Sequence, residues 1–198
     1  MRVVVTGGTG FTGSHSVRAL QAAGHEVCLL VRDAEKVKRV FEPLGLSFDD
    51  VVVGDMADPG PVGEALSGCD AVLHTAAMVD LKASRARTVI ETNRAGVENV
   101  IGQAAERGIS RIVYVSSLSI FFHPGCSPLH PDLPIPPAST AYGESKAAAE
   151  VYVRSLQEQG APIHVSYPVG IIGPEDPGMS DANHAVYSWF RDLTLKTS

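Results

Sequence analysis

Short apolar runs alternate with stretches of helical periodicity along this chain. The apolar runs are four to six residues long, and they predict strands at Arg2–Thr6, Glu26–Val31, Asp50–Val53, Ala71–Thr75, Arg111–Ser116 and Ile163–Tyr167. Apolar residues at helical spacing predict helices at Phe11–Ala23, Ala34–Leu44, Pro61–Leu66, Ala86–Arg107 and Ala141–Gln159. Because the strand runs are apolar at nearly every position, we expect both of their faces to be buried. The pattern therefore predicts an α/β fold, a doubly wound parallel sheet with helices on both faces.

Glycines and prolines mark where the predicted elements end. A glycine follows each of the five predicted helices, at Gly24, Gly45, Gly68, Gly108 and Gly160. We expect these glycines to adopt the left-handed conformation that caps a helix. Six prolines crowd the segment Phe122–Pro137, which predicts a loop. A long loop at the carboxyl end of a parallel strand lies on the ligand side of the sheet, so we expect it to face a substrate.

Composition narrows the classes of protein to which the chain can belong. Its 198 residues suffice for one well-buried domain. The net charge of −6 and pI near 5.6 argue against a nucleic-acid partner. The apolar runs are too short to cross a membrane and no signal-peptide pattern is present, so we expect no membrane partner and a cytoplasmic location. Cys28, Cys69 and Cys126 are odd in number and widely spaced, which favours free thiols over disulfides or a metal site.

The first predicted strand runs directly into a glycine-rich turn, Thr6–Gly13, that opens a helix. Gly7 and Gly10 permit a tight turn and a close approach of the backbone to a phosphate, and Gly13 lets the helix lie against the strand. The N-terminus of the helix adds unpaired N–H groups and a partial positive charge. The turn therefore predicts a site for the pyrophosphate of a dinucleotide. The alternative is a tight turn that binds nothing.

The end of the second predicted strand bears on which dinucleotide would bind. A site for NAD carries an acidic residue about 20 residues beyond the glycines, where it accepts hydrogen bonds from the ribose 2′-hydroxyl. This chain has Arg32 there, and a guanidinium suits the 2′-phosphate of NADP. Lys36, Lys38 and Arg39 follow and would reinforce the positive charge. The alternative is that Arg32 is a solvated surface cation and Asp33 binds the ribose.

Three residues are candidates for chemistry at the carboxyl edge of the sheet. Tyr142 and Lys146 are four residues apart in a predicted helix, so they project from one face. An ammonium beside a phenol lowers the pKa of the phenol, which would let Tyr142 exchange a proton with an alcohol or carbonyl oxygen near neutral pH. Ser117 follows the fifth predicted strand and could hydrogen-bond the same oxygen. This Tyr-x-x-x-Lys spacing arises by chance in many helices, so its meaning depends on its place beside the dinucleotide site.

With these residues placed, the chain resembles the extended short-chain dehydrogenase/reductase family from Met1 to about Pro174. The resemblance rests on ordered motifs: Thr6–Gly13, Gly54–Met56, His74–Ala77, Asn93–Val100, the trio Ser117, Tyr142 and Lys146, and Pro168–Pro174. It implies a Rossmann-type fold in which the trio is catalytic. Together with Arg32, it gives a set of cofactor-binding residues: Gly7, Thr9, Gly10, Phe11, Thr12, Gly13, Arg32, Asp55, Met56, Thr75, Ala76, Ala77, Lys146, Pro168 and Val169.

Within this family, the segment Val31–Asp33 and the basic helix after it resemble the dihydroflavonol-reductase and cinnamoyl-CoA-reductase branch more than the sugar-nucleotide epimerases. That resemblance implies NADPH in preference to NAD, and an NADP-dependent oxidoreductase that reduces the carbonyl of a small organic substrate. Two alternatives stay open. One is a sugar-nucleotide epimerase or dehydratase that uses the same trio, and the other is a non-catalytic NADP-binding module.

The resemblance also carries expectations about domains and assembly. Members of the family continue for roughly a hundred residues or more beyond the Gly-Pro, as a smaller domain that closes over the substrate. We therefore expect a dinucleotide-binding domain over residues 1–174 and a remnant of a largely missing substrate-binding region over residues 175–198, with one amphipathic helix at Asp181–Lys196. By resemblance, the helices at Ala86–Arg107 and Ala141–Gln159 would form the contact of a homodimer.

Overall fold

A six-stranded parallel sheet forms the centre of the protein. The computed structural model describes residues 1–80, 82–121, 130, 132–138 and 140–196. The strands are β1 (Arg2–Thr6), β2 (Glu26–Val31), β3 (Val51–Val53), β4 (Ala71–His74), β5 (Ile112–Val115) and β6 (Ile163–Ser166). They lie in the order β3-β2-β1-β4-β5-β6, and every neighbouring pair is parallel. The predicted parallel sheet is thus confirmed, and each strand begins and ends within one residue of its predicted limits.

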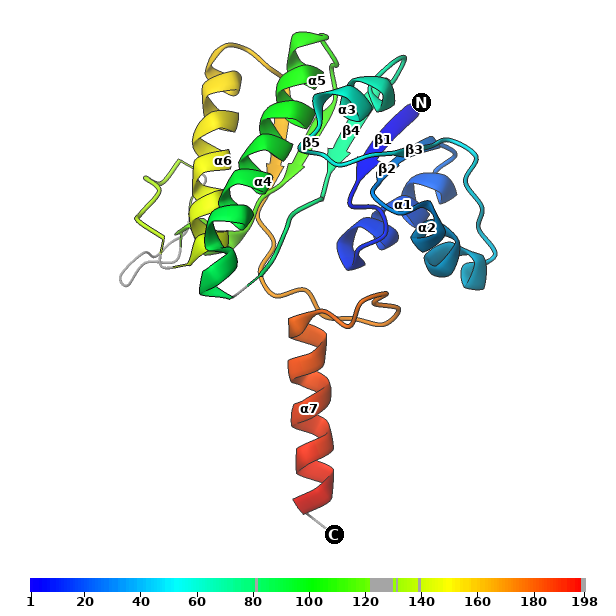
Figure 1. Cartoon of the computed structure of the whole chain (residues 1–198), viewed down its shortest axis with the longest axis vertical. Coiled ribbons are helices and arrows are strands. Elements are labelled where there is room, and N and C mark those ends of the chain that lie inside the picture. Colours follow the sequence, from blue (N-terminus) through cyan, green and yellow to red (C-terminus); the bar gives the residue numbers. More distant parts are fainter. Residues whose placement is uncertain (81, 122–129, 131, 139, 197–198) are drawn as a thin grey trace.

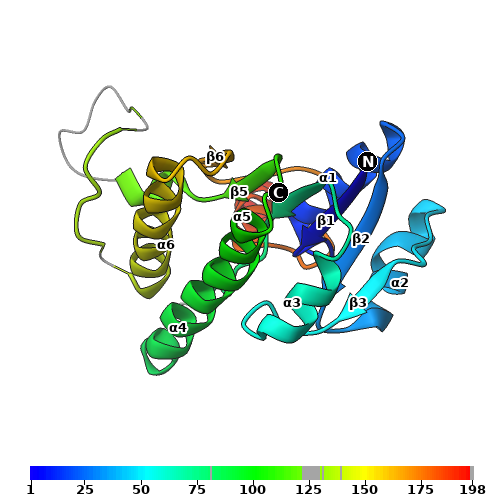
Figure 2. The same cartoon turned by 90° about the horizontal axis from the view of Figure 1, so that it is seen from above.

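Helices cover both faces of this sheet, as Figures 1 and 2 show. One face carries α3 (Pro59–Ala65), α6 (Ala141–Glu158) and a long helical rod made of α4 (Ala86–Val97), η3 (Glu98–Gly102) and α5 (Gln103–Glu106). The other face carries α1 (Phe11–Ala22) and α2 (Ala34–Phe41). Short 3₁₀ turns lie at η1 (Glu42–Leu44), η2 (Ala83–Arg85) and η4 (Leu118–Phe121). The last helix, α7 (Asp181–Lys196), extends away from the sheet (Figure 1).

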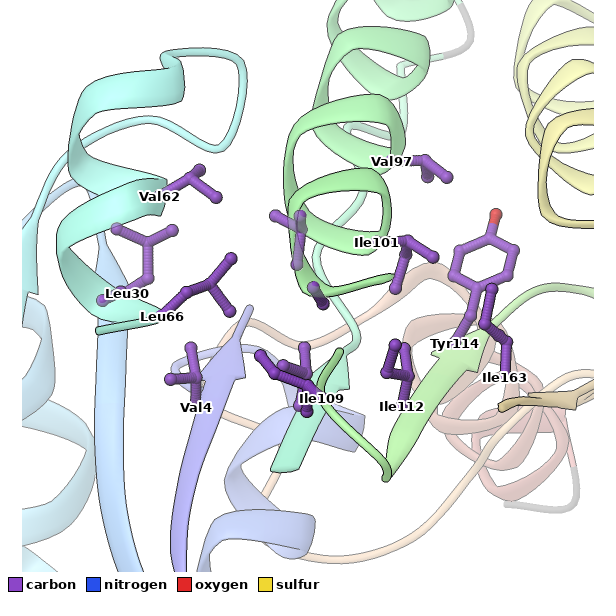
Figure 3. Close-up of a cluster of buried hydrophobic side chains, with 14 of the residues drawn as sticks. Val4, Leu30, Val62, Leu66, Val97, Ile101, Ile109, Ile112, Tyr114 and Ile163 are labelled. Atoms are coloured by element: carbon purple, nitrogen blue, oxygen red, sulfur yellow. The ribbon is translucent and has the colours of Figure 1, made fainter. Parts of the chain in front are cut away.

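The two faces of the sheet have separate apolar cores, because successive side chains of a strand point in opposite directions. Val4 packs in the core beneath α3, α4 and α6, while its neighbour Val5 packs in the core beneath α1 and α2. Figure 3 shows the first of these cores, in which Val4 and Ile112 from the sheet face Leu66 and Ile101 from the helices. Burial on both faces explains why the strands are almost continuously apolar.

The observed ends of the helices agree only in part with those predicted from the sequence. All five glycines predicted to cap helices have left-handed φ angles, between 67° and 94°. The predicted helix Ala86–Arg107 is not uniform, since residues 98–102 form a π-helical turn. The predicted helix Ala34–Leu44 ends as an α-helix at Phe41 and continues as the 3₁₀ turn η1. Helix α3 begins two residues earlier than predicted, because Asp58 accepts a hydrogen bond from Gly60 N–H at 2.9 Å and the first turn of a helix tolerates proline.

The remaining predictions concern the proline-rich loop, the tail and the thiols. Residues 130 and 132–137 form neither helix nor strand, while 122–129 and 131 lie outside the described residues. The helix predicted at Asp181–Lys196 is confirmed as α7, and it exposes Tyr187, Trp189 and Phe190. Cys28 and Cys69 are free thiols, and Cys126 lies outside the described residues. Within the described part of the chain, no helix is long and apolar enough to cross a membrane.

Candidate active site

The order of the strands reverses between β1 and β4, and a cleft lies at their carboxyl ends. In open α/β sheets, ligands bind in the crevice that such a reversal leaves. Nine of the residues predicted to bind a cofactor line this cleft: Gly7, Thr9, Gly10, Arg32, Asp55, Met56, Thr75, Ala76 and Ala77. The sequence therefore predicted most of the lining from segments that are far apart along the chain.

The glycine turn after β1 has no room for side chains at two of its positions. Gly7 has a φ of 71°, and a Cβ there would lie 2.6 Å from the amide nitrogen of Ala76. A Cβ on Gly13 would lie 2.1 Å from the carbonyl oxygen of Gly7. Gly13 thus lets α1 approach the turn itself, and not only the strand as the sequence suggested. Both glycines keep the backbone tight at the floor of the cleft.

Helix α1 begins directly after this turn, and no side chain caps it. Its N-cap residue is Gly10, which has no side chain to accept hydrogen bonds from the first N–H groups of the helix. Phe11, Thr12 and Gly13 form this first turn, and these three residues, which the sequence predicted to bind the cofactor, do not line the cleft. Uncapped N–H groups and the positive end of the helix dipole leave a place for an anion at the rim of the cleft.

The charged residues after β2 divide into those that line the cleft and those that do not. Arg32 lines it, with its side chain 77% exposed and its guanidinium 3.9 Å from the carboxylate of Asp55. Lys36 also lines it. Asp33 is occupied elsewhere, because it accepts a hydrogen bond from Glu35 N–H at 2.9 Å and pairs with Arg39 at 2.8 Å. That hydrogen bond from Arg39 lowers the pKa of the Asp33 carboxyl.

Lys38 and Arg39, which the sequence placed beside Arg32, do not line this cleft. Lys38 pairs with Glu35 along the surface of α2, at 2.8 Å. The positive charge at this end of the cleft comes from Arg32 and Lys36 among the residues that line it.

The carboxyl ends of β1 and β4 are joined by side-chain hydrogen bonds. The hydroxyl of Thr75 donates to Thr6 O at 2.8 Å, and Ala76 N–H donates to Thr6 Oγ1 at 3.3 Å. His74 Nδ1 lies 2.6 Å from the same Thr6 oxygen. Burial, together with the charge of Lys146, lowers the pKa of His74 to about 3, so this ring is neutral. The ring is also packed inside the protein, since His74 is 1% exposed.

Asn93 on α4 holds the loop that follows β4. Its Oδ1 accepts from Met78 N–H at 2.6 Å, and its Nδ2 donates to Met78 O at 2.9 Å and to Ser145 Oγ at 3.0 Å. Ser145 in turn donates to the carbonyl oxygen of Tyr142 at 2.7 Å. One amide therefore connects the wall of the cleft to the first turn of α6. Asn93 was noticed in the sequence only as part of a family motif.

The candidate catalytic residues stand at the start of α6 and the end of β5. Lys146 is 4% exposed, and its ammonium donates to Val115 O at 2.9 Å and to the Tyr114 hydroxyl at 3.4 Å. The same ammonium lies 5.9 Å from the centre of the Tyr142 ring. Ser117 accepts from the hydroxyl of Ser119 at 2.9 Å. The structure thus brings Tyr142 and Lys146 to one face, as their spacing predicted.

The pKa values at this site differ from the simplest expectation. Burial raises the pKa of the Tyr142 phenol, and a hydrogen bond with Ser117 acts against that rise. Burial lowers the pKa of Lys146 to about 8, and the negative charge of Glu150 acts against that fall. The predicted lowering of the phenol pKa by Lys146 is therefore wrong, because the ammonium is directed at Val115 O and Tyr114.

The predicted site residues form two groups at one edge of the sheet. The first lines the cleft between β1 and β4. The second, Ser117, Tyr142, Lys146, Pro168 and Val169, lies at the ends of β5 and β6 and on α6, and does not line that cleft. All six strands are parallel, so both groups stand at the carboxyl edge. Seven residues that line the cleft are not in the predicted cofactor-binding set, namely Thr6, Leu30, Val31, Lys36, Gly54, Met78 and Thr92. The strand ends among them could have been found from their place beside the turn.

Known proteins are similar to this chain over nearly its whole length. The sequence pattern of the NAD dependent epimerase/dehydratase family matches residues 3–197. A putative dihydroflavonol 4-reductase of Synechocystis sp. is 33% identical over 176 residues, which are 87% of this chain and 50% of that protein. A 3-beta-hydroxysteroid dehydrogenase of Mycolicibacterium neoaurum is 32% identical over 189 residues, which are 90% of this chain and 50% of that protein. The chain thus spans about half the length of these curated relatives.

Among solved structures, a dTDP-glucose 4,6-dehydratase double mutant of Streptomyces venezuelae with bound NAD has a TM-score of 0.80 and 25% identity. The match covers 97% of this chain and 63% of that one. A TM-score of this size shows that the two chains share their backbone fold over the matched residues.

Proposed function

Because this chain belongs to the NAD dependent epimerase/dehydratase family, we propose that it binds NADPH and acts as an NADP-dependent oxidoreductase on the carbonyl of a small organic substrate. In this proposal residues 1–174 are the dinucleotide-binding domain, and residues 175–198 belong to the substrate-binding region. The observation that carries the proposal is the placement of the buried Lys146, with Tyr142 beside it, at the same sheet edge as an uncapped glycine turn.

The cleft between β1 and β4 fits a dinucleotide. A pyrophosphate at the turn would meet the uncapped N–H groups of Phe11 and Thr12, and the absence of Cβ atoms at Gly7 and Gly13 lets the backbone lie close to it. Asp55, which lines the cleft, would accept a hydrogen bond from the adenine amino group. Lys146, with Pro168 and Val169, is the group proposed for the nicotinamide end. When bound, the dinucleotide supplies the hydride for the reaction.

Arg32 and Lys36 support NADP as the preferred dinucleotide. Both line the cleft, and the exposed contact of Arg32 with Asp55 at 3.9 Å is too weak to hold the guanidinium away from a phosphate. The competing proposal, in which Asp33 binds an unmodified ribose as in an NAD site, is disfavoured because the Asp33 carboxylate caps α2 and pairs with Arg39.

Titration with NADPH and NADH tests this choice. We expect NADPH to bind more tightly, and Arg32→Ala to weaken NADPH alone by roughly ten- to a hundredfold, since a charge-assisted contact contributes about 1.5–3 kcal/mol. Arg87→Ala is a matched control, because Arg87 lies on α4 with its side chain 89% exposed and, among the described residues, pairs with Glu91 along its own helix. Equal affinities of the wild-type protein for the two nucleotides would refute the preference for NADP.

The three residues at β5 and α6 support the proton chemistry. Tyr142 would donate its phenolic proton to the carbonyl oxygen as the hydride reaches the carbon, and Ser117 would hydrogen-bond the same oxygen. Lys146 would hold the positive charge that stabilises the phenolate left behind. Lys146 is buried and Tyr142 is partly buried, and this low-dielectric surrounding strengthens the interaction between the ammonium and the phenolate.

A sugar-nucleotide epimerase or dehydratase is the second candidate function, and the similarity to a dTDP-glucose 4,6-dehydratase over 97% of this chain favours it. The same trio would then take a proton from a sugar hydroxyl and later return it, while the hydride of that carbon would pass to the bound dinucleotide and back. Turnover separates the candidates: a panel of carbonyl compounds with NADPH would show activity in the first case, and nucleotide sugars in the second. A protein that binds NADPH and turns over neither class would be a non-catalytic binding module.

A further inference from the structure

Glu150 is a carboxylate with no exposed surface, on the helix that carries Tyr142 and Lys146. It follows Lys146 by four residues, so both side chains project from one face of α6. Three donors reach its oxygens: Ser116 Oγ at 3.2 Å, the Tyr167 hydroxyl at 2.5 Å and Arg154 Nε at 3.1 Å. A buried charge is costly unless it is paired and hydrogen-bonded, and this carboxylate is both.

Two of these donors are the residues that immediately precede the proposed site segments. Ser116 comes directly before Ser117, and Tyr167 comes directly before Pro168. The two segments also pair through their backbones, since Ser116 N–H donates to Ser166 O at 2.8 Å and Leu118 N–H donates to Pro168 O at 3.0 Å. The carboxylate of Glu150 therefore joins the end of β5 to the end of β6 at the point where both chains enter the site.

The titratable groups around Lys146 come from several elements, and most of them are neutral. His74 on β4 is neutral because burial lowers its pKa to about 3, and Tyr114 on β5 is neutral because burial raises its pKa. Tyr142, on α6, is also an undissociated phenol, with a pKa raised by burial. Among the described groups that face Lys146, Glu150 therefore supplies the negative charge. Arg154 lies beyond Glu150 along the helix, so the carboxylate separates two cations.

We propose that Glu150 is a positioning residue for the reaction: it fixes the segments that carry Ser117 and Pro168, and it is the buried counter-charge one helical turn from the Lys146 ammonium. This inference rests on the proposed function, because only that function makes the site catalytic. The contacts of Glu150 and its effect on Lys146 belong to the folded chain and need no substrate or cofactor. Glu150 touches neither substrate nor cofactor in this account.

Glu150→Gln separates the charge from the shape of this side chain. The amide keeps the volume and can still accept a hydrogen bond, but the negative charge is lost. Because an opposite charge nearby shifts a pKa by about one to three units, we expect the pKa of Lys146 to fall from about 8 by about one unit or more. Glu158→Gln is the matched control, since Glu158 is exposed near the end of the same helix and the same substitution there leaves Lys146 unchanged.

The titration is followed in the full chain by NMR of ¹³Cε-labelled lysine, with Lys146→Met to assign the Lys146 signal. Amide exchange at Leu118, whose N–H bonds to Pro168 O, reports the link between the two segments. We expect Glu150→Gln to lower the Lys146 pKa and to speed exchange at Leu118 several-fold. An unchanged Lys146 pKa would overturn the proposal. With any carbonyl substrate that is turned over, the alkaline limb of kcat should move to lower pH by the same amount.

Tyr167→Phe provides a second test, which can be used if Glu150→Gln does not fold. It removes one donor and leaves the charge, so exchange at Leu118 should rise while the Lys146 pKa stays in place. Slow exchange at Leu118 in this variant would refute the link between the segments. Neither measurement needs a substrate or a dinucleotide, so a wild-type protein that fails to bind NADPH refutes the proposed function without deciding the role of Glu150.

Discussion

Replacing Gly13 by alanine tests whether the turn after β1 binds a dinucleotide. A Cβ at this position would lie 2.1 Å from Gly7 O and 2.9 Å from Gly8 Cα. Both neighbours are backbone atoms, and ordinary contact begins at 3.4 Å, so the turn and α1 must separate by more than 1 Å. This separation would move the N–H groups that are proposed to bind the pyrophosphate.

The cost to folding is small compared with the cost to binding. Overpacking costs about 1–3 kcal/mol, and the better helix propensity of alanine returns about 1 kcal/mol, so the free energy of unfolding should fall by up to about 2 kcal/mol. Each charge-assisted hydrogen bond to a phosphate contributes about 1.5–3 kcal/mol. The loss of even one such bond should raise the Kd for NADPH by roughly tenfold or more.

Gly24→Ala is the control for a general loss of stability. Gly24 has a φ of 79° and no atom within 4 Å of the added Cβ, so the substitution strains only the backbone. That strain costs about 1–2 kcal/mol, similar to the cost at Gly13, and lies far from the turn. Urea unfolding and fluorescence titration with NADPH should show two destabilised proteins, of which only Gly13→Ala has lost affinity. A folded Gly13→Ala protein that binds NADPH within twofold of wild type would refute the site.

Two further predictions concern the trio at β5 and α6. Tyr142→Phe should abolish turnover and leave the affinity for NADPH nearly unchanged, because the phenol acts on the substrate; retention of most activity would refute its role. Turnover should fall as pH rises through about 8, where Lys146 loses its proton, and the protein should stay folded there. Its lowered pKa means that the unfolded chain binds more protons between about pH 8 and 10.5, so this group makes the folded state more stable as pH rises in that window. A fall in turnover that coincides with unfolding, measured by circular dichroism, would contradict this explanation.

The fold was predictable because its signals are local and repeated. A strand such as Glu26–Val31 is apolar at five of its six positions and needs burial on both faces, which helices on a parallel sheet provide. The π-helical turn at residues 98–102 was not predictable, because the apolar spacing on either side of it is that of one continuous helix. In the folded chain the rod passes so close to α6 there that a Cβ on Gly102 would lie 2.4 Å from the Tyr152 hydroxyl.

Site residues were predictable only where they form a short motif of residues close together in the sequence. The glycine turn and the Tyr142–Lys146 spacing are such cases. Asn93 and Glu150 are not, because a polar residue on a helix usually faces solvent, and nothing local shows that these two are buried at 4% and 0% exposure. Their partners, Met78 for Asn93 and Ser116 for Glu150, come from segments that only the folded sheet brings near.

One face of the sheet supplies residues to both the candidate site and the apolar core, so the two share side chains and contacts. Thr6, His74 and Tyr114 are register partners on β1, β4 and β5, and they follow the apolar Val4, Val72 and Ile112 on the same face. In Figure 3 the Tyr114 hydroxyl points away from the apolar side chains below it. Two contacts join these polar groups, one of 2.6 Å between Thr6 and His74 and one of 3.4 Å between Lys146 and Tyr114, while His74 Nε2 is buried without a hydrogen-bond partner among the described residues. A variant in this row changes packing and chemistry together, so a loss of activity here identifies a catalytic role only when the free energy of unfolding is measured with it.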